Sequence, residues 1–275
     1  MSDEPAPLQP EPCLNCGTMV ELEFCPACGQ RRGDFRKSLL RLIGDVFRET
    51  TEFDGRFGRT LRGMLRPGRI TREFNQGKRQ RYVSPVRLYL FVSLLMFAAA
   101  SLSLRLHTMM DPPEGGVTQL EFNDGTDETA TGFDRLLQER IDELGKLPPA
   151  ERDQKIFSGA LDNGPLLMFV LLPVFALLLK LVFLGTGGLY VEHLVFSLHV
   201  HSVWFLLAIP ALAIPYAWSA VFLLPIPFYT VFALQHAYDA SWWATALRSM
   251  ALGFLYFNAL ALGMVAALFM ALLLG

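Results

Sequence analysis

Residues 193–238 read HLVFSLHVHSVWFLLAIPALAIPYAWSAVFLLPIPFYTVFALQHAY and contain no Lys, Arg, Asp or Glu. A membrane-spanning helix needs about 20 predominantly apolar residues. The part from Leu194 to Leu234 is too long for one span and suits two, with a turn near Pro210 to Trp218. This stretch therefore predicts a chain that crosses a membrane more than once.

Three further stretches have the same character and lie on either side of this one. They cover about 86–106, 165–184 and 249–274, and the last is also free of charged residues. Of the 275 residues, 52% are hydrophobic and 18% are charged, whereas about a quarter are charged in a typical soluble domain. We expect a mainly α fold, a polytopic membrane helix bundle of about five spans.

Charge is divided unevenly between the two segments that flank the first span. Residues 31–84 hold 15 Lys/Arg and 6 Asp/Glu, whereas residues 107–163 hold 5 Lys/Arg and 13 Asp/Glu. Basic segments stay on the cytoplasmic side of a membrane, and the polar stretch Met1–Pro12 is not a signal peptide. We therefore expect a cytoplasmic N-terminus, with the acidic loop and the C-terminus on the outer side.

The basic segment predicts two helices. Over residues 35–50, apolar side chains recur on one face among basic ones, a pattern typical of a helix that lies on anionic lipid. A second short helix is expected over about 56–65, ended by Pro67-Gly68. Two interpretations remain open for this segment, namely contact with the lipid surface and packing against the membrane bundle.

All four cysteines fall in one short window, as Cys13-x2-Cys16-x8-Cys25-x2-Cys28, and a glycine follows each pair. Four thiolates presented from two tight turns close a tetrahedral shell that suits Zn²⁺. A disulfide pair is disfavoured in the cytoplasm, and a thioredoxin-like motif would need a βαβ setting. An iron–sulfur centre is the remaining alternative. We predict a structural, zinc-ribbon-like knuckle with no open position for a substrate.

The knuckle and the segment after it resemble a known family. The runs CLNCGTMVELEFCPACGQRRG (13–33) and FDGRFGRTLRGMLRPGRITREFNQGKRQRYVSPVRLYLFVSLLMF (53–97) are similar to the bacterial membrane family catalogued as domain of unknown function 3667. The shared motifs are CxNCG…FCPxCGQ, TL…PG and GKR…Y…P. The resemblance implies an integral membrane protein with a zinc knuckle. In the inner membrane of a bacterial cell, the charge distribution would then put the acidic loop in the periplasm. The resemblance implies no activity.

The third span carries polar side chains, and ionisable groups inside a membrane are candidates for function. With 3.6 residues per turn, His193, Ser197 and His201 share one face of the helix. The fourth span should return to the same side of the membrane, where Glu192, His193, His236 and Asp239 could gather at an inner vestibule. The candidate polar site comprises Glu192, His193, His199, His201, His236 and Asp239. Packing between helices, an ion or proton pathway, and enzymatic chemistry remain open.

The predicted parts are a disordered lead (1–12), the zinc knuckle (13–30), basic juxtamembrane helices (31–84), the first span (85–107), an acidic external loop (108–163) and a four-span bundle (164–275). A closed metal site beside a basic segment favours a non-enzymatic scaffold or regulator with a protein partner in the cytoplasm or membrane. The alternatives are a small transporter or channel and a lipid-acting enzyme. Nucleic acid is a weaker partner than the lipid bilayer, because the predicted topology already explains the basic charge.

Overall fold

The computed structural model describes residues 9–32, 55–110 and 142–274, except residues 187 and 215. Within these residues, five helical segments are long and apolar enough to cross a membrane. They are α4 (Pro85–Met110), α6 (Pro149–Val182), α7 (Tyr190–Ala211), the pair α8 (Tyr216–Leu223) and α9 (Pro225–Tyr238), and α10 (Trp242–Leu274). The prediction of a mainly α bundle with about five spans and an N-terminal four-cysteine cluster is confirmed.

The fourth span is built from two helices because of a proline. Leu224 still donates a backbone hydrogen bond of 2.8 Å to Ala220, but Pro225 has no N–H with which to continue the ladder. α9 therefore begins at Pro225, in the first turn, where a helix tolerates proline best. The two helices together provide the apolar segment Trp218–Tyr238.

α7 is the central helix of the bundle. Inside the protein, 61% of its span is buried, against 28% or less for each of the other four, and it contacts α3, α4, α6, α8 and α9. On α10, by contrast, Trp243, Phe254 and Phe257 are each at least 70% exposed. Exposed apolar surface of this extent marks a contact with a membrane or a partner, so the outer helices present the surface that suits lipid.

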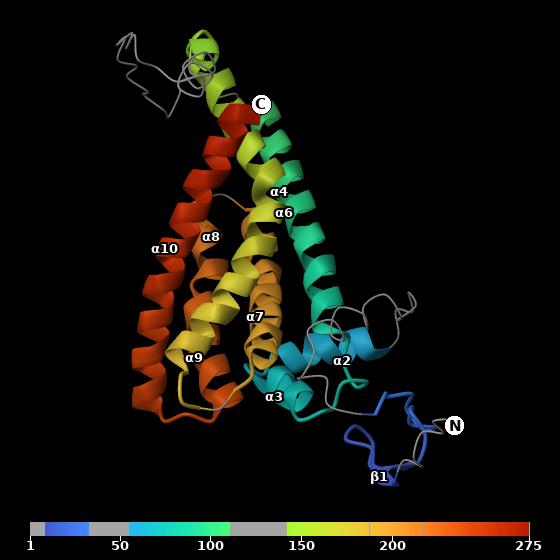
Figure 1. Ribbon diagram of the computed structural model, residues 1–275. Coiled ribbons are helices and arrows are strands. Elements are labelled where there is room, and N and C mark those ends of the chain that lie inside the picture. The colour runs from blue at the N-terminus through green and yellow to red at the C-terminus, as the bar shows by residue number, and fades with distance from the viewer. Residues whose placement is uncertain (1–8, 33–54, 111–141, 187, 215, 275) are drawn as a thin grey trace, which may run out of the picture.

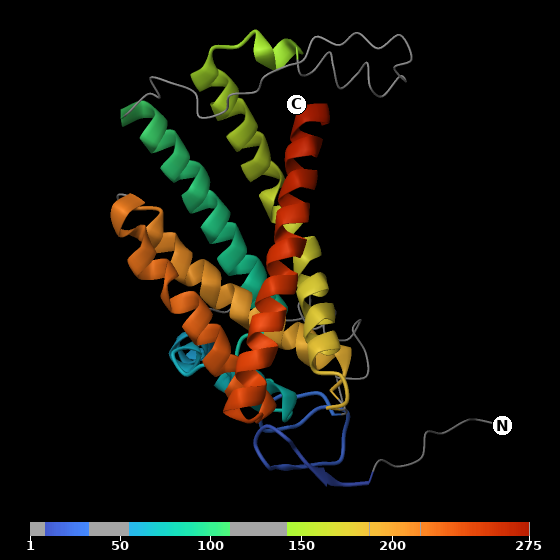
Figure 2. The ribbon, with the colours of Figure 1, turned by 90° about the vertical axis from the view of Figure 1, so that its left-hand side faces the viewer.

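The two ends of the bundle differ in what they carry. The knuckle, α2 (Gly55–Met64) and α3 (Arg69–Asn75) lie at the end where α6 connects to α7 and α9 to α10 (Figures 1 and 2). The C-terminus lies at the opposite end, where α4, α6 and α10 spread apart (Figure 2). The described parts of the basic segment (55–84) and of the acidic segment (142–163) thus lie at opposite ends, as one span between them requires.

α2 and α3 pack on the bundle, which is one of the two arrangements left open for the basic segment. Phe57 of α2 meets Phe91 of α4 edge to face, with ring centroids 5.8 Å apart, and α3 contacts α7 and α9. α2 lies where a helix was expected over 56–65. The helix expected over 35–50 lies outside the described residues, and contact with lipid stays a prediction.

α6 is longer than the span that its sequence predicts. It begins at Pro149, well inside the predicted loop 108–163, and its apolar part is Asn163–Val182. Proline in the first turn starts a helix readily, and Arg152 donates a backbone hydrogen bond of 3.0 Å to Pro148. The end of the predicted loop is therefore helical. Residues 111–141 of that loop lie outside the described residues.

Candidate metal centre and the polar residues of the bundle

Each cysteine pair of the knuckle sits on one copy of the same turn. The backbone N–H of Gly17 donates to the carbonyl oxygen of Cys13 over 2.8 Å, and that of Gly29 donates to Cys25 over 2.9 Å. Both glycines have positive φ angles, 81° and 70°, which residues with a side chain rarely adopt. The glycine after each CxxC therefore lets the chain fold back so that both thiols of a pair point to one side.

Two short pairings of extended backbone hold the two turns together. β1 (Glu11–Pro12) pairs antiparallel with β2 (Met19–Val20), and Phe24 forms an isolated bridge with Arg31. Val20 is buried beside the cysteines in a small core of its own. Because so few apolar side chains fill this core, the knuckle needs another source of folding energy, such as a bound metal ion.

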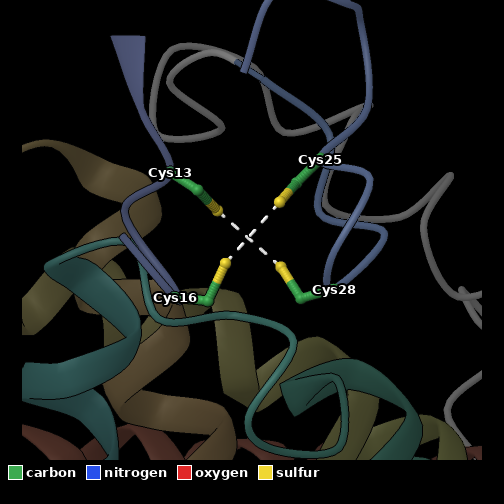
Figure 3. Close-up of side chains that lie close together, drawn as sticks. All are labelled: Cys13, Cys16, Cys25 and Cys28. Atoms are coloured by element: carbon green, nitrogen blue, oxygen red, sulfur yellow. Dashed lines mark hydrogen bonds between the residues drawn. The ribbon is translucent and has the colours of Figure 1, made fainter. Parts of the chain in front are cut away.

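The four thiols converge on one point (Figure 3). All four sulfur atoms lie within 4.8 Å of one another, with Cys13 Sγ 3.7 Å from Cys28 Sγ and Cys16 Sγ 3.6 Å from Cys25 Sγ. A disulfide bond would bring two sulfurs to about 2.05 Å, and the cysteines are free thiols. Four convergent sulfur ligands are the donor set of a candidate metal site.

The thiols differ in acidity. Hydrogen bonding with Thr18 lowers the pKa of Cys16 to about 6, whereas burial raises the pKa of Cys28. Cys16 is also exposed, while Cys13 and Cys25 are buried. Metals bind the thiolate form, and Cys16 is the exposed thiol whose pKa is lowered.

Gln30 anchors the knuckle to the loop between α3 and α4. Its buried side-chain N–H group donates to the carbonyl oxygen of Gly77 over 2.9 Å. Its side-chain oxygen lies 3.3 Å and 3.4 Å from the backbone nitrogens of Arg79 and Gln80, which donate to it. Leu14 lies so close that a Cβ atom on Gly77 would meet its Cδ1 atom at 2.7 Å. The cysteine knuckle therefore packs against the loop between α3 and α4.

The third-span histidines make hydrogen bonds to other parts of the protein. His201 Nδ1 lies 2.8 Å from the carbonyl oxygen of Ser197, and Nε2 lies 2.8 Å from the hydroxyl of Tyr256 on α10. His193 Nδ1 lies 2.7 Å from the hydroxyl of Tyr238 on α9, with the two rings stacked. A neutral imidazole with Nδ1 protonated satisfies both contacts of His201, because a carbonyl oxygen only accepts.

His199 faces away from these two residues. Its Nδ1 lies 3.0 Å from the hydroxyl of Thr71 on α3, and its ring meets Phe74 edge to face. Its Nε2 atom is buried and makes no hydrogen bond within the described residues. Helical periodicity predicts that His199 lies on a different face of the helix from His193 and His201. The structure agrees, and α3 packs against the face that carries His199.

The four residues of the expected inner vestibule make contacts with different partners, although Glu192 Oε2 and His193 Nε2 would both lie within 3.6 Å of a Cβ atom placed on Gly188. Glu192 accepts a hydrogen bond from the backbone of Leu189 at the start of its own helix. The exposed His236 lies 2.8 Å from the carbonyl oxygen of Phe232 on its own helix, and Asp239 pairs with Arg72 at 3.6 Å. His193 thus reaches α9 through its hydrogen bond with Tyr238, and Asp239 reaches α3 through its ion pair with Arg72.

Sequence reasoning did not select two residues that matter here, Thr71 and Tyr256. One signal was available for Tyr256, because a tyrosine inside an apolar span needs a partner for its hydroxyl. Nothing in the local pattern distinguishes Thr71 from other threonines.

Comparison with curated proteins and with solved structures finds no match. A family model does match part of the chain. It covers α2, α3, the loop that receives Gln30, and the first half of α4. It does not include the cysteines, and it assigns no activity. Over residues 54–97 the chain is thus similar to the family described as protein of unknown function (DUF3667), which agrees with the resemblance seen in its motifs.

Proposed function

We propose that this chain is a multi-pass membrane scaffold or regulator whose four cysteines hold a structural Zn²⁺ ion. The knuckle forms a platform that is seated on the bundle and engages a protein partner. The observation that carries the proposal is the set of three hydrogen bonds between Gln30 and the loop 77–80. This loop follows α3 directly, and α3 packs on α7 and α9.

The sulfur geometry supports zinc as the metal. With Zn–S distances of about 2.3 Å, a tetrahedral site has sulfur–sulfur edges of about 3.8 Å. Two of the sulfur pairs are 3.7 Å and 3.6 Å apart. Four cysteine ligands fill the tetrahedral shell, so the ion stabilises the fold and leaves no position for a substrate.

The surroundings of the knuckle favour a platform. Three of its apolar side chains, Met19, Leu22 and Phe24, are 47–70% exposed, which suits contact with a protein partner. The basic charge of residues 31–84 supports a cytoplasmic position for this end of the bundle, and we propose the inner membrane of a bacterial cell as its location. His193 and His201 are engaged in hydrogen bonds between helices, which favours packing over transport or lipid chemistry.

Metal analysis of the purified full-length protein tests the zinc part of the proposal. We expect a single zinc per chain by inductively coupled plasma mass spectrometry, and its loss from Cys25→Ser. His236→Ala is the control, because this residue is exposed at the same end of the bundle and makes no contact with the knuckle cysteines. Zinc-free protein, or zinc retained by Cys25→Ser, would contradict the assignment.

Crosslinking in cells followed by quantitative mass spectrometry of the tagged full chain tests the platform. A protein partner should be recovered with the wild type and with His236→Ala. Its recovery should fall sharply with Cys25→Ser, which removes a metal ligand, and with Leu22→Ser, which keeps all four cysteines. Equal recovery of all partners with every variant would exclude the knuckle as a platform.

A further inference from the structure

Five arginines and a tyrosine line one cavity beside α2 and α3. Its volume is about 200 Å³, and its walls include Arg59, Arg62, Arg66, Arg69, Arg81 and Tyr82. This cavity has room for a phosphate group and some of the atoms that carry it. It lies outside the metal centre, on the part of the chain that joins the knuckle to the bundle.

The fold gathers these arginines from three places in the chain. Arg59 and Arg62 are one turn apart on α2, and Arg66 follows in the turn after that helix. Arg69 opens α3, and Arg81 precedes α4. The tight turn at Pro67-Gly68, where Gly68 has a φ of 76°, folds α3 back so that these guanidinium groups face a common space.

One carboxylate organises the cavity without neutralising it. Glu73 Oε1 pairs with Arg69 at 2.9 Å. Glu73 Oε2 accepts a hydrogen bond from the Tyr82 hydroxyl at 2.6 Å and lies 3.9 Å from Arg81. The side chain of Glu73 is only 13% exposed and Tyr82 is 3% exposed. One wall of the cavity is therefore fixed in place.

Positive charge exceeds negative charge in the cavity. Within the described part of the chain, neither Arg62 nor Arg66 pairs with a carboxylate. Guanidinium groups repel one another when they face a common space, so an anion placed among them gains from all five. The planar fork of a guanidinium matches two oxygens of a phosphate, and clusters of arginine are the usual means by which proteins recognise this group.

The geometry points to a binding site for a phosphate group in the cavity formed by Arg59, Arg62, Arg66, Arg69 and Arg81. The phosphate belongs to a membrane lipid headgroup or to a soluble phosphate compound. This site is independent of zinc and goes beyond the proposed platform. Two observations place it near the membrane surface: Phe57 of α2 packs on Phe91 of α4, and Leu65, between two of the arginines, is 81% exposed.

Binding assays on the full chain test the site and identify the source of the phosphate. The first arm titrates the protein in zwitterionic detergent with inorganic pyrophosphate by isothermal calorimetry. The second arm reconstitutes it in phosphatidylcholine nanodiscs with or without phosphatidic acid and measures retained lipid by native mass spectrometry. Binding of pyrophosphate assigns a soluble source, and retention of phosphatidic acid without pyrophosphate binding assigns a lipid source.

A matched pair of variants separates the cavity from general charge. Take the probe that the wild type binds, either pyrophosphate or phosphatidic acid. Arg62→Gln/Arg66→Gln should weaken its binding by about tenfold or more, since hydrogen bonds between charged groups are lost. Arg105→Gln/Lys155→Gln removes the same charge from exposed residues elsewhere on α4 and α6 and should leave binding unchanged. Equal binding by the two double variants, or no binding of either probe by the wild type, would overturn the site.

A footprint on the wild type covers the case in which the double variant fails to fold. Phenylglyoxal modifies accessible arginines, and peptide mass spectrometry locates the modified positions. The probe that the wild type binds should protect Arg62 and Arg66 from phenylglyoxal, while Arg105 is modified to the same extent with and without the probe. If neither probe changes the modification of Arg62 and Arg66, the proposed site is contradicted, independently of the results with the variants.

Discussion

Thr71 on α3 and His199 on α7 share a hydrogen bond of 3.0 Å, although 128 residues separate them in the chain. Both side chains are at most 5% exposed. α3 therefore belongs to the packed interior at one end of the bundle. The basic segment 31–84, in which helices were expected only over 35–50 and 56–65, thus supplies a partner for a polar residue of the third span.

Removing either partner of this hydrogen bond should lower the free energy of unfolding. Removing both partners should lower it by less than the two single changes added together. Thr71→Val leaves the buried imidazole Nδ1 without its partner, at a cost of about 1–3 kcal/mol. His199→Leu similarly leaves the threonine hydroxyl unpaired. The double variant replaces both partners with apolar groups, and its loss should be smaller than the sum of the single losses. Thermal unfolding of the full chain in detergent measures all three, and strictly additive losses would show that the two residues do not interact.

Gly68→Ala should separate α3 from α9. The φ of Gly68 is 76°, and a Cβ atom there would lie 2.5 Å from the carbonyl oxygen of Ala233, a backbone atom that cannot turn aside. Gly185 is the matched control, because its φ is 88° but nothing lies within 4 Å of its Cβ position. Both variants incur backbone strain of about 1–2 kcal/mol, and only Gly68→Ala adds the clash. Equal falls in the thermal midpoint would contradict this packing.

Gln30→Ala should release the knuckle from the loop 77–80 while leaving its cysteines in place. The substitution removes all three hydrogen bonds of the Gln30 side chain and leaves a buried carbonyl oxygen on Gly77 unpaired, at a cost of about 1–3 kcal/mol. Hydrogen–deuterium exchange at Arg79 and Gln80 should become faster. Gln76→Ala, an exposed change beside the same loop, should leave their exchange unchanged. Slow exchange in Gln30→Ala would mean that other contacts seat the knuckle.

The ion pairs around Glu73 predict a loss of stability in acid. Burial raises the pKa of Glu73, but the hydrogen bond from Tyr82 and the pairing with Arg69 outweigh burial, and the pKa is lowered overall. A carboxyl whose pKa is lower in the folded state stabilises the fold at neutral pH. This contribution is lost as the pH falls through the lowered pKa, which is below the usual value of about 4.3.

Tyr82→Phe removes one of the groups that lower the pKa of Glu73, so the loss in acid should begin at a higher pH than in the wild type. The thermal midpoint of the full chain, measured against pH, tests this shift. Tyr190→Phe is the control, because the hydroxyl of Tyr190 bonds to the carbonyl oxygen of Pro173 and to no carboxylate. Identical pH profiles for wild type and Tyr82→Phe would show that Tyr82 has no influence on Glu73.

The features that sequence predicted well are local ones. The spans follow from long apolar runs with few or no charged residues, because ionised groups are costly in lipid wherever they lie in the fold. The cysteine cluster follows from two CxxCG turns that close within residues 13–30. In both cases the decisive interactions join residues that are near in the chain, so spacing alone is informative.

Long-range partners were not predictable in the same way. Periodicity placed His193, Ser197 and His201 on one face, and the structure joins them through hydrogen bonds one turn apart. Tyr256, the partner of His201 Nε2, lies 55 residues away. The position of a side chain along a helix axis follows from its place in the sequence. The neighbouring helix that it faces depends on how each helix is oriented about its own axis in the packed bundle. For this reason spacing did not reveal that His193 turns to Tyr238, or that His236 and Asp239 contact Phe232 and Arg72.

The seating of Gln30 also imposes an order on biogenesis. A chain folds from its N-terminus as it is synthesised, so residues 13–30 emerge first and hold all four metal ligands before any span exists. The loop 77–80 follows, and α7 and α9, which receive α3, come last. Under the proposed zinc site, the ligands are complete before the first span is synthesised, and a shortage of zinc during synthesis would leave the later helices to insert around a knuckle that lacks its metal.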